Sequence, residues 1–155
     1  MHTSDPSPLI EATFRRIHTE RMHDLPMVNP ALAVAAVGFA RADGKEWRGA
    51  LLTPWGIGLL LLPASADWQP VVEHARIYRQ YASGNFVFLG NREEGLGEYL
   101  FCPLIHDMSQ LTDQETAVMT ARACLIALDM APPQASPEPE PEVCSGRRKF
   151  LSMGS

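Results

Sequence analysis

Cys102 and His106 are residues of this sequence whose types could form a nucleophile and its base. A thiol beside an imidazole can act as a catalytic dyad, in which the imidazole withdraws the proton of the thiol. The spacing i, i+4 brings two side chains together only on a helix, and Pro103 indicates the end of a strand instead. We therefore predict no catalytic dyad and interpret Cys102 as a small buried residue of a strand.

Histidine and cysteine residues are scattered along the chain without the paired spacing of a structural metal site. They are His2, His18, His23, His74 and His106, together with Cys102, Cys124 and Cys144. Because the cysteines match neither a zinc site nor a disulfide framework, they favour a reducing cytoplasm. We expect no cofactor, and one alternative stays open, in which Cys102, His106 and Cys144 carry nickel or iron.

The sequence Arg147-Arg148-Lys149-Phe150-Leu151 resembles a twin-arginine export signal. Such a signal belongs at an N-terminus, ahead of a long apolar segment. In this sequence only Ser152 to Ser155 follow, so we do not expect the peptide to direct export. Two interpretations remain: a solvated basic tail, or a mimic of a signal peptide that occupies a groove of this protein.

Two further segments could bind an apolar partner. Thr53-Pro54-Trp55 separates two apolar stretches. Its Trp55 either fills the core or lies at the lip of a groove, because tryptophan buries much area and keeps one polar donor. The segment Met22-His23-Asp24-Leu25 either caps the preceding helix or presents Met22 and Leu25 to a partner.

The composition favours a soluble single domain with tails. The 155 residues are 46% hydrophobic and 20% charged, which is ordinary for a globular protein. The formal net charge of -5 argues against nucleic-acid binding, which normally needs a basic surface. The apolar run 57–63 is too short to span a membrane, and the N-terminus lacks the apolar core of a secretory signal. We expect a cytoplasmic protein without membrane insertion.

Periodicity predicts the elements that must position these residues. Ser7 and Pro8 favour a helix start, and Ile10, Phe14 and Ile17 share one face of a helix that ends near Met22. Thr112 and Glu115 predict a capping box for the last helix. Its apolar stripe is Ala117, Ala121, Cys124, Leu125 and Leu128. Between these helices we predict strands at 32–40, 46–53 and 57–62, a helix at 71–82, and a hairpin of 86–90 with 97–104.

These elements predict an α+β fold in the order α-βββ-α-ββ-α. Short connections favour an antiparallel sheet, of about five strands, with the helices packed on one face. The domain organisation follows from composition: residues 1–7 are predicted to be disordered, and 8–131 form one domain. Residues 132–143 form a stiff Pro/Glu tether, and 144–155 form the basic tail with Arg-Arg-x-Phe-Leu.

The same segments, in the same order from about Leu9 to Leu151, resemble the HybE/HupJ/HoxT family of NiFe-hydrogenase assembly chaperones. They are the segments 22–25, Thr53-Pro54-Trp55, Gly97-Glu98-Tyr99-Leu100-Phe101-Cys102-Pro103-Leu104, and the terminal Arg-Arg-x-Phe-Leu. The chain departs from the family pattern at 105–108, where the family has a more apolar Ser-Pro segment, and in its long tether.

The resemblance implies a cytoplasmic accessory protein that is not an enzyme, with a layer similar to that of secretion chaperones. Its partners would be the hydrogenase large-subunit precursor, the small subunit with its twin-arginine signal peptide, and other hydrogenase accessory proteins. The alternative becomes a small metal-carrying or oxygen-protective maturation protein. The residues expected to bind partners are Met22, His23, Asp24, Leu25, Pro54, Trp55, Tyr99, Cys102, Arg147, Arg148, Phe150 and Leu151.

Overall fold

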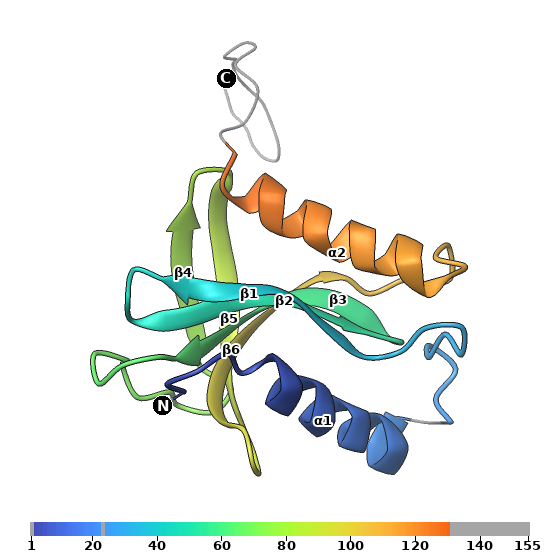
Figure 1. Cartoon of the computed structure of the whole chain (residues 1–155), viewed down its shortest axis with the longest axis horizontal. Coiled ribbons are helices and arrows are strands. Elements are labelled where there is room, and N and C mark those ends of the chain that lie inside the picture. Colours follow the sequence, from blue (N-terminus) through green and yellow to red (C-terminus); the bar gives the residue numbers. More distant parts are fainter. Residues whose placement is uncertain (1, 23, 131–155) are drawn as a thin grey trace, which may run out of the picture.

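A computed structural model describes residues 2–22 and 24–130 and shows a layered α+β domain. An antiparallel sheet lies between two helices, which cover opposite faces of it (Figure 1). The elements in chain order are α1 (Ser7–Ile17), the π-helical turn η1 (His18–Met22), β1 (Ala35–Ala42), β2 (Glu46–Thr53), β3 (Gly56–Pro63), β4 (Arg76–Tyr81), β5 (Gly84–Glu93), β6 (Gly97–Ile105) and α2 (Gln114–Leu128). The predicted fold class is confirmed, with six strands in place of about five.

The sheet order is β1-β2-β3-β6-β5-β4, and every neighbouring pair is antiparallel. After β3 the chain crosses to the far edge at β4 and then returns through β5 to β6, which pairs with β3. The sheet therefore consists of two three-stranded meanders that meet in its middle, with β1 and β4 as its edges.

Strand β3 is buried on both faces, and this places one helix on each side of the sheet. Leu60 and Leu62 pack with the α1 residues Ile10 and Phe14. Leu59 and Leu61 instead pack in the cluster that holds Leu128 of α2. The prediction that both helices cover one face is wrong, because a strand without polar alternation must be covered twice.

The predicted helix at 71–82 is wrong as well, since this stretch contains the edge strand β4. Ile77 and Tyr81 face the α2 side of the sheet, whereas Tyr78 between them is 68% exposed. The period-two alternation of residues 76–81 therefore predicts the strand correctly, whereas the helical spacing of Val72 and Ala75 does not correspond to a helix. Pairing of β4 with β5 supplies the backbone hydrogen bonds. The element order is accordingly α-βββ-βββ-α.

The cap of α2 lies one residue later than the predicted capping box. Asp113, rather than Thr112, is the N-cap residue, and its carboxylate accepts a hydrogen bond of 2.7 Å from the Thr116 amide. The apolar stripe through Ala117, Ala121 and Leu128 is buried as predicted. Aspartate suits this position because its side chain pairs with an amide that the helix leaves free.

The N-terminal residues contact the sheet, although the sequence predicts disorder for 1–7. The His2 amide donates to the Pro63 carbonyl, and the Trp47 indole donates to the His2 carbonyl, both at 2.8 Å. Asp5 then accepts from the amide and hydroxyl of Ser7, the first residue of α1. These contacts hold His2 beside the end of β3 and Asp5 at the start of α1.

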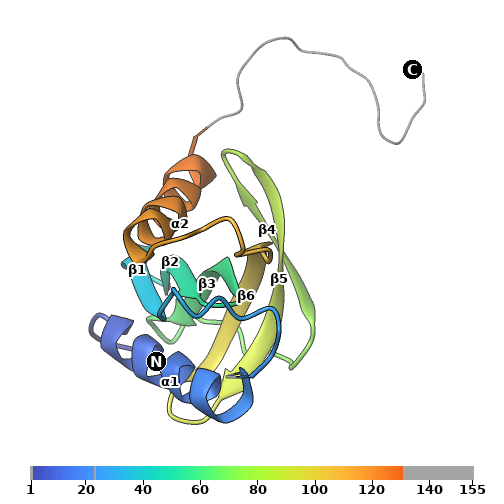
Figure 2. The same ribbon diagram turned by 90° about the vertical axis from the view of Figure 1, so that its right-hand side faces the viewer.

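The β4–β5 hairpin bends towards α2, so the sheet is strongly curved (Figure 2). Ser83, in the hairpin turn, donates to the Leu128 carbonyl at the end of α2. Arg79 of β4 forms an ion pair of 2.9 Å with the buried Glu46 of β2. The curved sheet closes around α2 and buries one face of β4 and β5. No helix among residues 2–22 and 24–130 is long and apolar enough to cross a membrane.

The register of β5 predicts opposite roles for two neighbouring residues. Phe88 is fully buried, whereas Val87 is 38% exposed on the other face. Replacing a buried phenylalanine with alanine typically costs about 3–5 kcal/mol through lost burial and the remaining cavity. We expect a loss of this size for Phe88→Ala in urea unfolding and less than about 1 kcal/mol for the control Val87→Ala. Equal losses would contradict the described register.

Candidate functional site

An apolar cavity of about 310 Å³ lies on the α1 face, where β2 and β6 end and β3 begins. Its lining comes from α1, from four strands and from the β2–β3 turn. The residues are Phe14, Leu51, Thr53, Trp55, Gly56, Ile57, Asn91, Tyr99, Phe101, Pro103, Ile105 and His106. We call this the Trp55 cavity. Its volume lies at the lower end of the ~300–1,000 Å³ usual for ligand pockets, which suits a few apolar side chains.

The turn that carries Trp55 is fixed by local contacts. Thr53 pairs with Gly56 across the turn, and its hydroxyl donates to the Gly56 carbonyl at 2.9 Å. Pro54 is fully buried, and its carbonyl accepts from the Asn29 amide. A Cβ on Gly56 would lie 2.9 Å from the Ile105 carbonyl oxygen, so only glycine fits there. Trp55 therefore enters the cavity wall from a rigid turn.

Helix α1 supplies Phe14 to the other wall, and its extension η1 packs beside Trp55. The His18 ring lies 5.6 Å from the Trp55 ring, measured between centroids. Met22, at the end of η1, packs against the same core cluster as Trp55. Arg21 pairs with Glu93 of β5 at 2.8 Å, which fastens η1 to the sheet. Met22 and Trp55 thus belong to the same face of the molecule.

Tyr99 forms the floor between α1 and the cavity. Its ring packs edge-on against Phe14 with a centroid distance of 5.9 Å, and only 6% of the residue is exposed. Burial raises the pKa of Tyr99 to about 12, and the nearby Glu93 carboxylate adds to the effect. The phenol is therefore neutral at physiological pH and contributes an apolar surface rather than a base.

Beyond the cavity, α1 leaves the outer part of the same sheet face uncovered. Leu89 pairs with Phe101 and Tyr78 pairs with Val87, so these side chains continue the face across three strands. We call Tyr78, Val87, Leu89, Phe101 and Pro103 the open sheet face. Leu89 is 37% exposed and Tyr78 is 68% exposed. The Trp55 cavity and the open sheet face share Phe101 and Pro103, so they adjoin on one face of the sheet.

Cys102 lies on the opposite face of β6 and does not line the cavity. It packs with Phe88 and Leu128 on the α2 side, as expected for a small buried residue. Burial raises the pKa of the Cys102 thiol, which disfavours a nucleophilic thiolate. His106 borders the Trp55 cavity, so the two residues point to different sides of the sheet. No group of three His, Cys, Asp or Glu side chains among the described residues could hold a metal ion.

The structure brings some of the predicted partner-binding residues to one face. Trp55 and Tyr99 line the cavity and Met22 packs beside it, while Pro54 is buried in the turn that supports Trp55. Asp24 and Leu25 follow η1 in the next turn. His23, Cys144, Arg147, Arg148, Phe150 and Leu151 lie outside the described residues.

Sequence reasoning missed Tyr78, Val87, Leu89 and Phe101. The sequence predicts a helix around Tyr78, and an apolar residue on a strand gives no sign of whether a helix covers it. One signal was present in β5, where Val87 and Leu89 alternate with Phe86 and Phe88. This alternation predicts a strand that is apolar on both faces.

Comparisons with known proteins agree with one another. The family model described as NiFe-hydrogenase assembly, chaperone, HybE matches residues 5–153. Protein HoxT of Cupriavidus necator is 34% identical over 157 residues, which cover 92% of this chain and 85% of that protein. Probable rubredoxin HupJ of Rhodobacter capsulatus is 36% identical over 142 residues; these cover 91% of this chain, which spans about half (51%) of that relative. Hydrogenase-2 operon protein HybE of Escherichia coli is 27% identical, with 97% and 90% covered.

One solved structure has a similar fold. The solution structure of HybE from Escherichia coli aligns with a TM-score of 0.70 at 24% sequence identity. The alignment covers 96% of this chain and 93% of that one. The arrangement of sheet and helices is therefore shared along nearly the whole length.

The burial of Tyr99 predicts a pH dependence of stability at alkaline pH. The folded phenol has a pKa of about 12, whereas an unfolded tyrosine titrates near its ordinary value of about 10. The stabilisation is fully present below pH ~10 and is lost as the pH rises to ~12, because the unfolded state releases its proton first. Unfolding in urea across this range should show a smaller decline for Tyr99→Phe than for the parent chain. The exposed Tyr78→Phe is the control, and parallel curves for Tyr99→Phe and the parent chain would contradict the assignment.

Proposed function

We propose that this chain, which belongs to the HybE family of NiFe-hydrogenase assembly chaperones, binds an apolar segment of an immature hydrogenase subunit on its α1 face. The observation that carries this proposal is the exposed apolar surface of the Trp55 cavity and of the open sheet face that adjoins it. Soluble monomers seldom leave such a surface uncovered unless it binds something. The proposed activity is binding without catalysis.

The two parts of this surface suit different tasks. The Trp55 cavity is concave and has a rigid aromatic edge, so it can anchor one or two side chains of the bound segment. The open sheet face has no surrounding wall and is half-exposed, so it can cover the rest of the segment. A chaperone must release its client, and the shallow contact over Leu89 and Tyr78 favours moderate affinity.

The proposed client is the hydrogenase small subunit with its twin-arginine signal peptide, and the large-subunit precursor is the second. A signal peptide contains an apolar stretch of about 7–15 residues, long enough to reach from the cavity across β6 and β5. The chain carries a formal net charge of -5, which attracts the arginines that precede such a stretch. Binding before export places the encounter in the cytoplasm, where other accessory proteins of hydrogenase maturation would also meet it.

The tail adds a proposed control of this site. Arg147, Arg148, Phe150 and Leu151 would compete with the signal peptide by entering the same cavity from within the chain. A tethered competitor acts at an effective concentration that the linker sets, so weak binding is sufficient. Arginine suits this role because its planar guanidinium can donate two hydrogen bonds to one carboxylate.

A charge on the open sheet face should weaken client binding. Leu89→Asp places a carboxylate where the proposed segment must be desolvated, and we expect affinity for a hydrogenase signal peptide to fall at least ~10-fold, or about 1.4 kcal/mol. Met119→Asp is the matched control, because Met119 is 64% exposed on α2 at the opposite face. Isothermal titration and co-purification with both hydrogenase subunits measure the effect. Equal affinity in the two variants, with both folded, would contradict the proposal that the open sheet face binds the client.

Removing one arginine of the tail should strengthen binding of the signal peptide if the tail competes for the site. Arg148→Gln and Lys149→Gln change the net charge equally, but only the first alters the Arg-Arg-x-Phe-Leu pattern. We expect a several-fold higher affinity for Arg148→Gln and no change for Lys149→Gln. Identical affinities would leave the tail as a solvated segment without a part in binding.

A further inference from the structure

The outer edge of β1 is protected along only part of its length. Just before the strand, the Gln114 side chain accepts from the Ala33 amide and donates to the Ala33 carbonyl, as a neighbouring strand would. The Glu11 carboxylate accepts from the Ala36 amide. Side chains from both helices thus occupy the beginning of this edge, which is a common defence against unwanted strand pairing.

The rest of the edge is open. The register between β1 and β2 shifts between Val37 and Ala40, and no backbone partner outside β2 is found for residues 38–41 among the described residues. Gly38 adopts a φ of +67°, and a Cβ there would lie 2.7 Å from Leu125 of α2. This bulge at Gly38 therefore depends on glycine, and the open edge begins where the side-chain protection ends.

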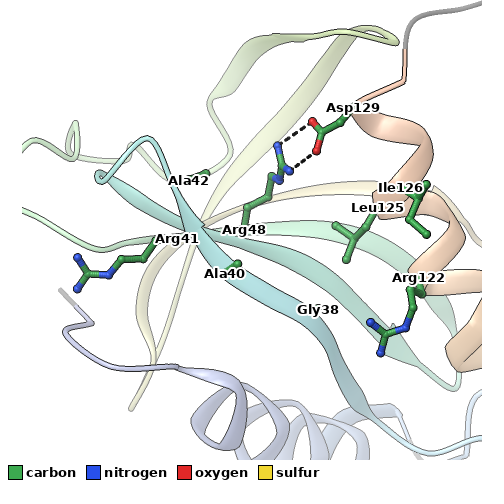
Figure 3. Close-up of a pocket in the computed structure, with 9 residues that line it drawn as sticks. All are labelled: Gly38, Ala40, Arg41, Ala42, Arg48, Arg122, Leu125, Ile126 and Asp129. Carbon is green, nitrogen blue, oxygen red and sulfur yellow. Dashed lines mark hydrogen bonds and ion pairs between the residues drawn. The ribbon is translucent and has the colours of Figure 1, made fainter.

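A groove of about 320 Å³ runs between this open edge and α2 (Figure 3). Leu125 and Ile126 form its α2 wall, and Ile126 is 59% exposed. Figure 3 shows Arg122 and Arg48 on the α2 side of β1, whereas Arg41 points away on the other side. The groove can therefore accept an extended chain between a strand edge and a helix.

The charge of the groove is positive. The Arg48 guanidinium binds the Asp129 carboxylate through two hydrogen bonds of 2.6 and 3.2 Å. Arg122 forms no ion pair with any residue of the described ranges 2–22 and 24–130. Two guanidinium groups thus face one carboxylate, in a chain whose formal net charge is -5. An acidic extended segment fits this groove best.

We propose that residues 137–142 of this chain, Pro-Glu-Pro-Glu-Pro-Glu, bind in the groove as a seventh strand antiparallel to β1. The amide and carbonyl of each residue in a strand point to one side, and those of its neighbours point to the other. Glu138, Glu140 and Glu142 therefore direct all their amides to the same side, towards β1. The prolines, which lack an amide proton, lie on the outer side, where an edge strand needs no donor.

The same alternation orders the side chains and the backbone. Side chains of alternate residues project from the same face of a sheet, so the three carboxylates can all lie on the α2 side with Arg122 and Arg48. A residue before proline is restricted to extended conformations, which applies to Glu138 and Glu140. Part of the entropy lost on docking is therefore already absent in the free segment.

The chain path permits this docking. Gln114 at the start of α2 contacts Ala33 before β1, while Asp129 after α2 contacts Arg48, which is paired with Ala40. Helix α2 thus runs in the same direction as β1, and a chain that leaves it must turn back antiparallel to β1. Residues 131–136 supply a connection within the usual length of about 2–6 residues. A strand of 137–142 is about 20 Å long, which spans residues 38–42.

This placement brings the basic tail to the end of the sheet that holds the Trp55 cavity. A segment antiparallel to β1 ends beside the start of β1, where Ala35 pairs with Leu52. The next residue, Thr53, lines the cavity. The seventh strand itself is independent of the proposed client, because it rests on the β1 edge and the arginines of the groove.

Amide hydrogen exchange of the full chain, followed residue by residue by NMR, tests the seventh strand. Glu140→Pro removes the central donor that faces β1, and we expect exchange of the outward-facing amides among residues 38–41 to accelerate at least ~10-fold. Pro139→Ala is the matched control, because it keeps every inward donor and every charge. We expect that variant to exchange at the rate of the parent chain.

The result that would overturn the proposal is equal exchange at residues 38–41 in the parent chain and Glu140→Pro. Protection that increases with protein concentration would assign the edge to a second copy and would also overturn it. So would protection that appears only after a hydrogenase precursor is added. Reversing the charges gives an independent test. Arg122→Glu should accelerate amide hydrogen exchange at residues 38–41. Adding Glu140→Arg to that variant should restore the protection of these amides at least in part.

Discussion

Burial of β3 on both faces is the constraint on which the remaining structure depends. Its run of leucines cannot face water on either side, so α1 and α2 must cover opposite faces of the sheet. The sheet is wider than either helix. On the α2 side it curves until the β4–β5 hairpin closes around the helix, but on the α1 side the same curvature leaves the outer strands uncovered. The open sheet face follows directly from this asymmetry.

The proposed role of this surface in binding does not require catalytic groups. Its rigid part is the β2–β3 turn, where Pro54 and Gly56 hold Trp55 in the cavity wall. Its adaptable part is the strand surface of β5 and β6, whose side chains are already half-exposed. This combination is consistent with a member of an assembly-chaperone family, because an unfinished client needs a surface that shields apolar groups and then releases them.

The sequence predicted the local elements better than their arrangement. Period-two and helical patterns located β2, β3, the β5–β6 hairpin and α2. Trp55 and Tyr99, two of the residues expected to bind partners, line the same cavity. The helix at 71–82 failed because Val72, Ala75 and Tyr78 mimic a helical face, while β4 is stabilised by pairing with β5. The prediction that the helices pack on one face was wrong. The apolar run of β3 indicates that both faces of the sheet are covered, but it does not indicate which elements cover them. The open sheet face was missed because exposure depends on where α1 ends, which is a tertiary property.

Chemical-shift mapping of the labelled full chain, titrated with the twin-arginine signal peptide of a hydrogenase small subunit, tests the central claim most directly. The account predicts saturating shifts at the Trp55 indole, Tyr99, Leu89 and Val87, with the exposed face of α2 around Met119 unchanged. Shifts restricted to α2, or no shifts at a concentration at which the peptide binds, would contradict it.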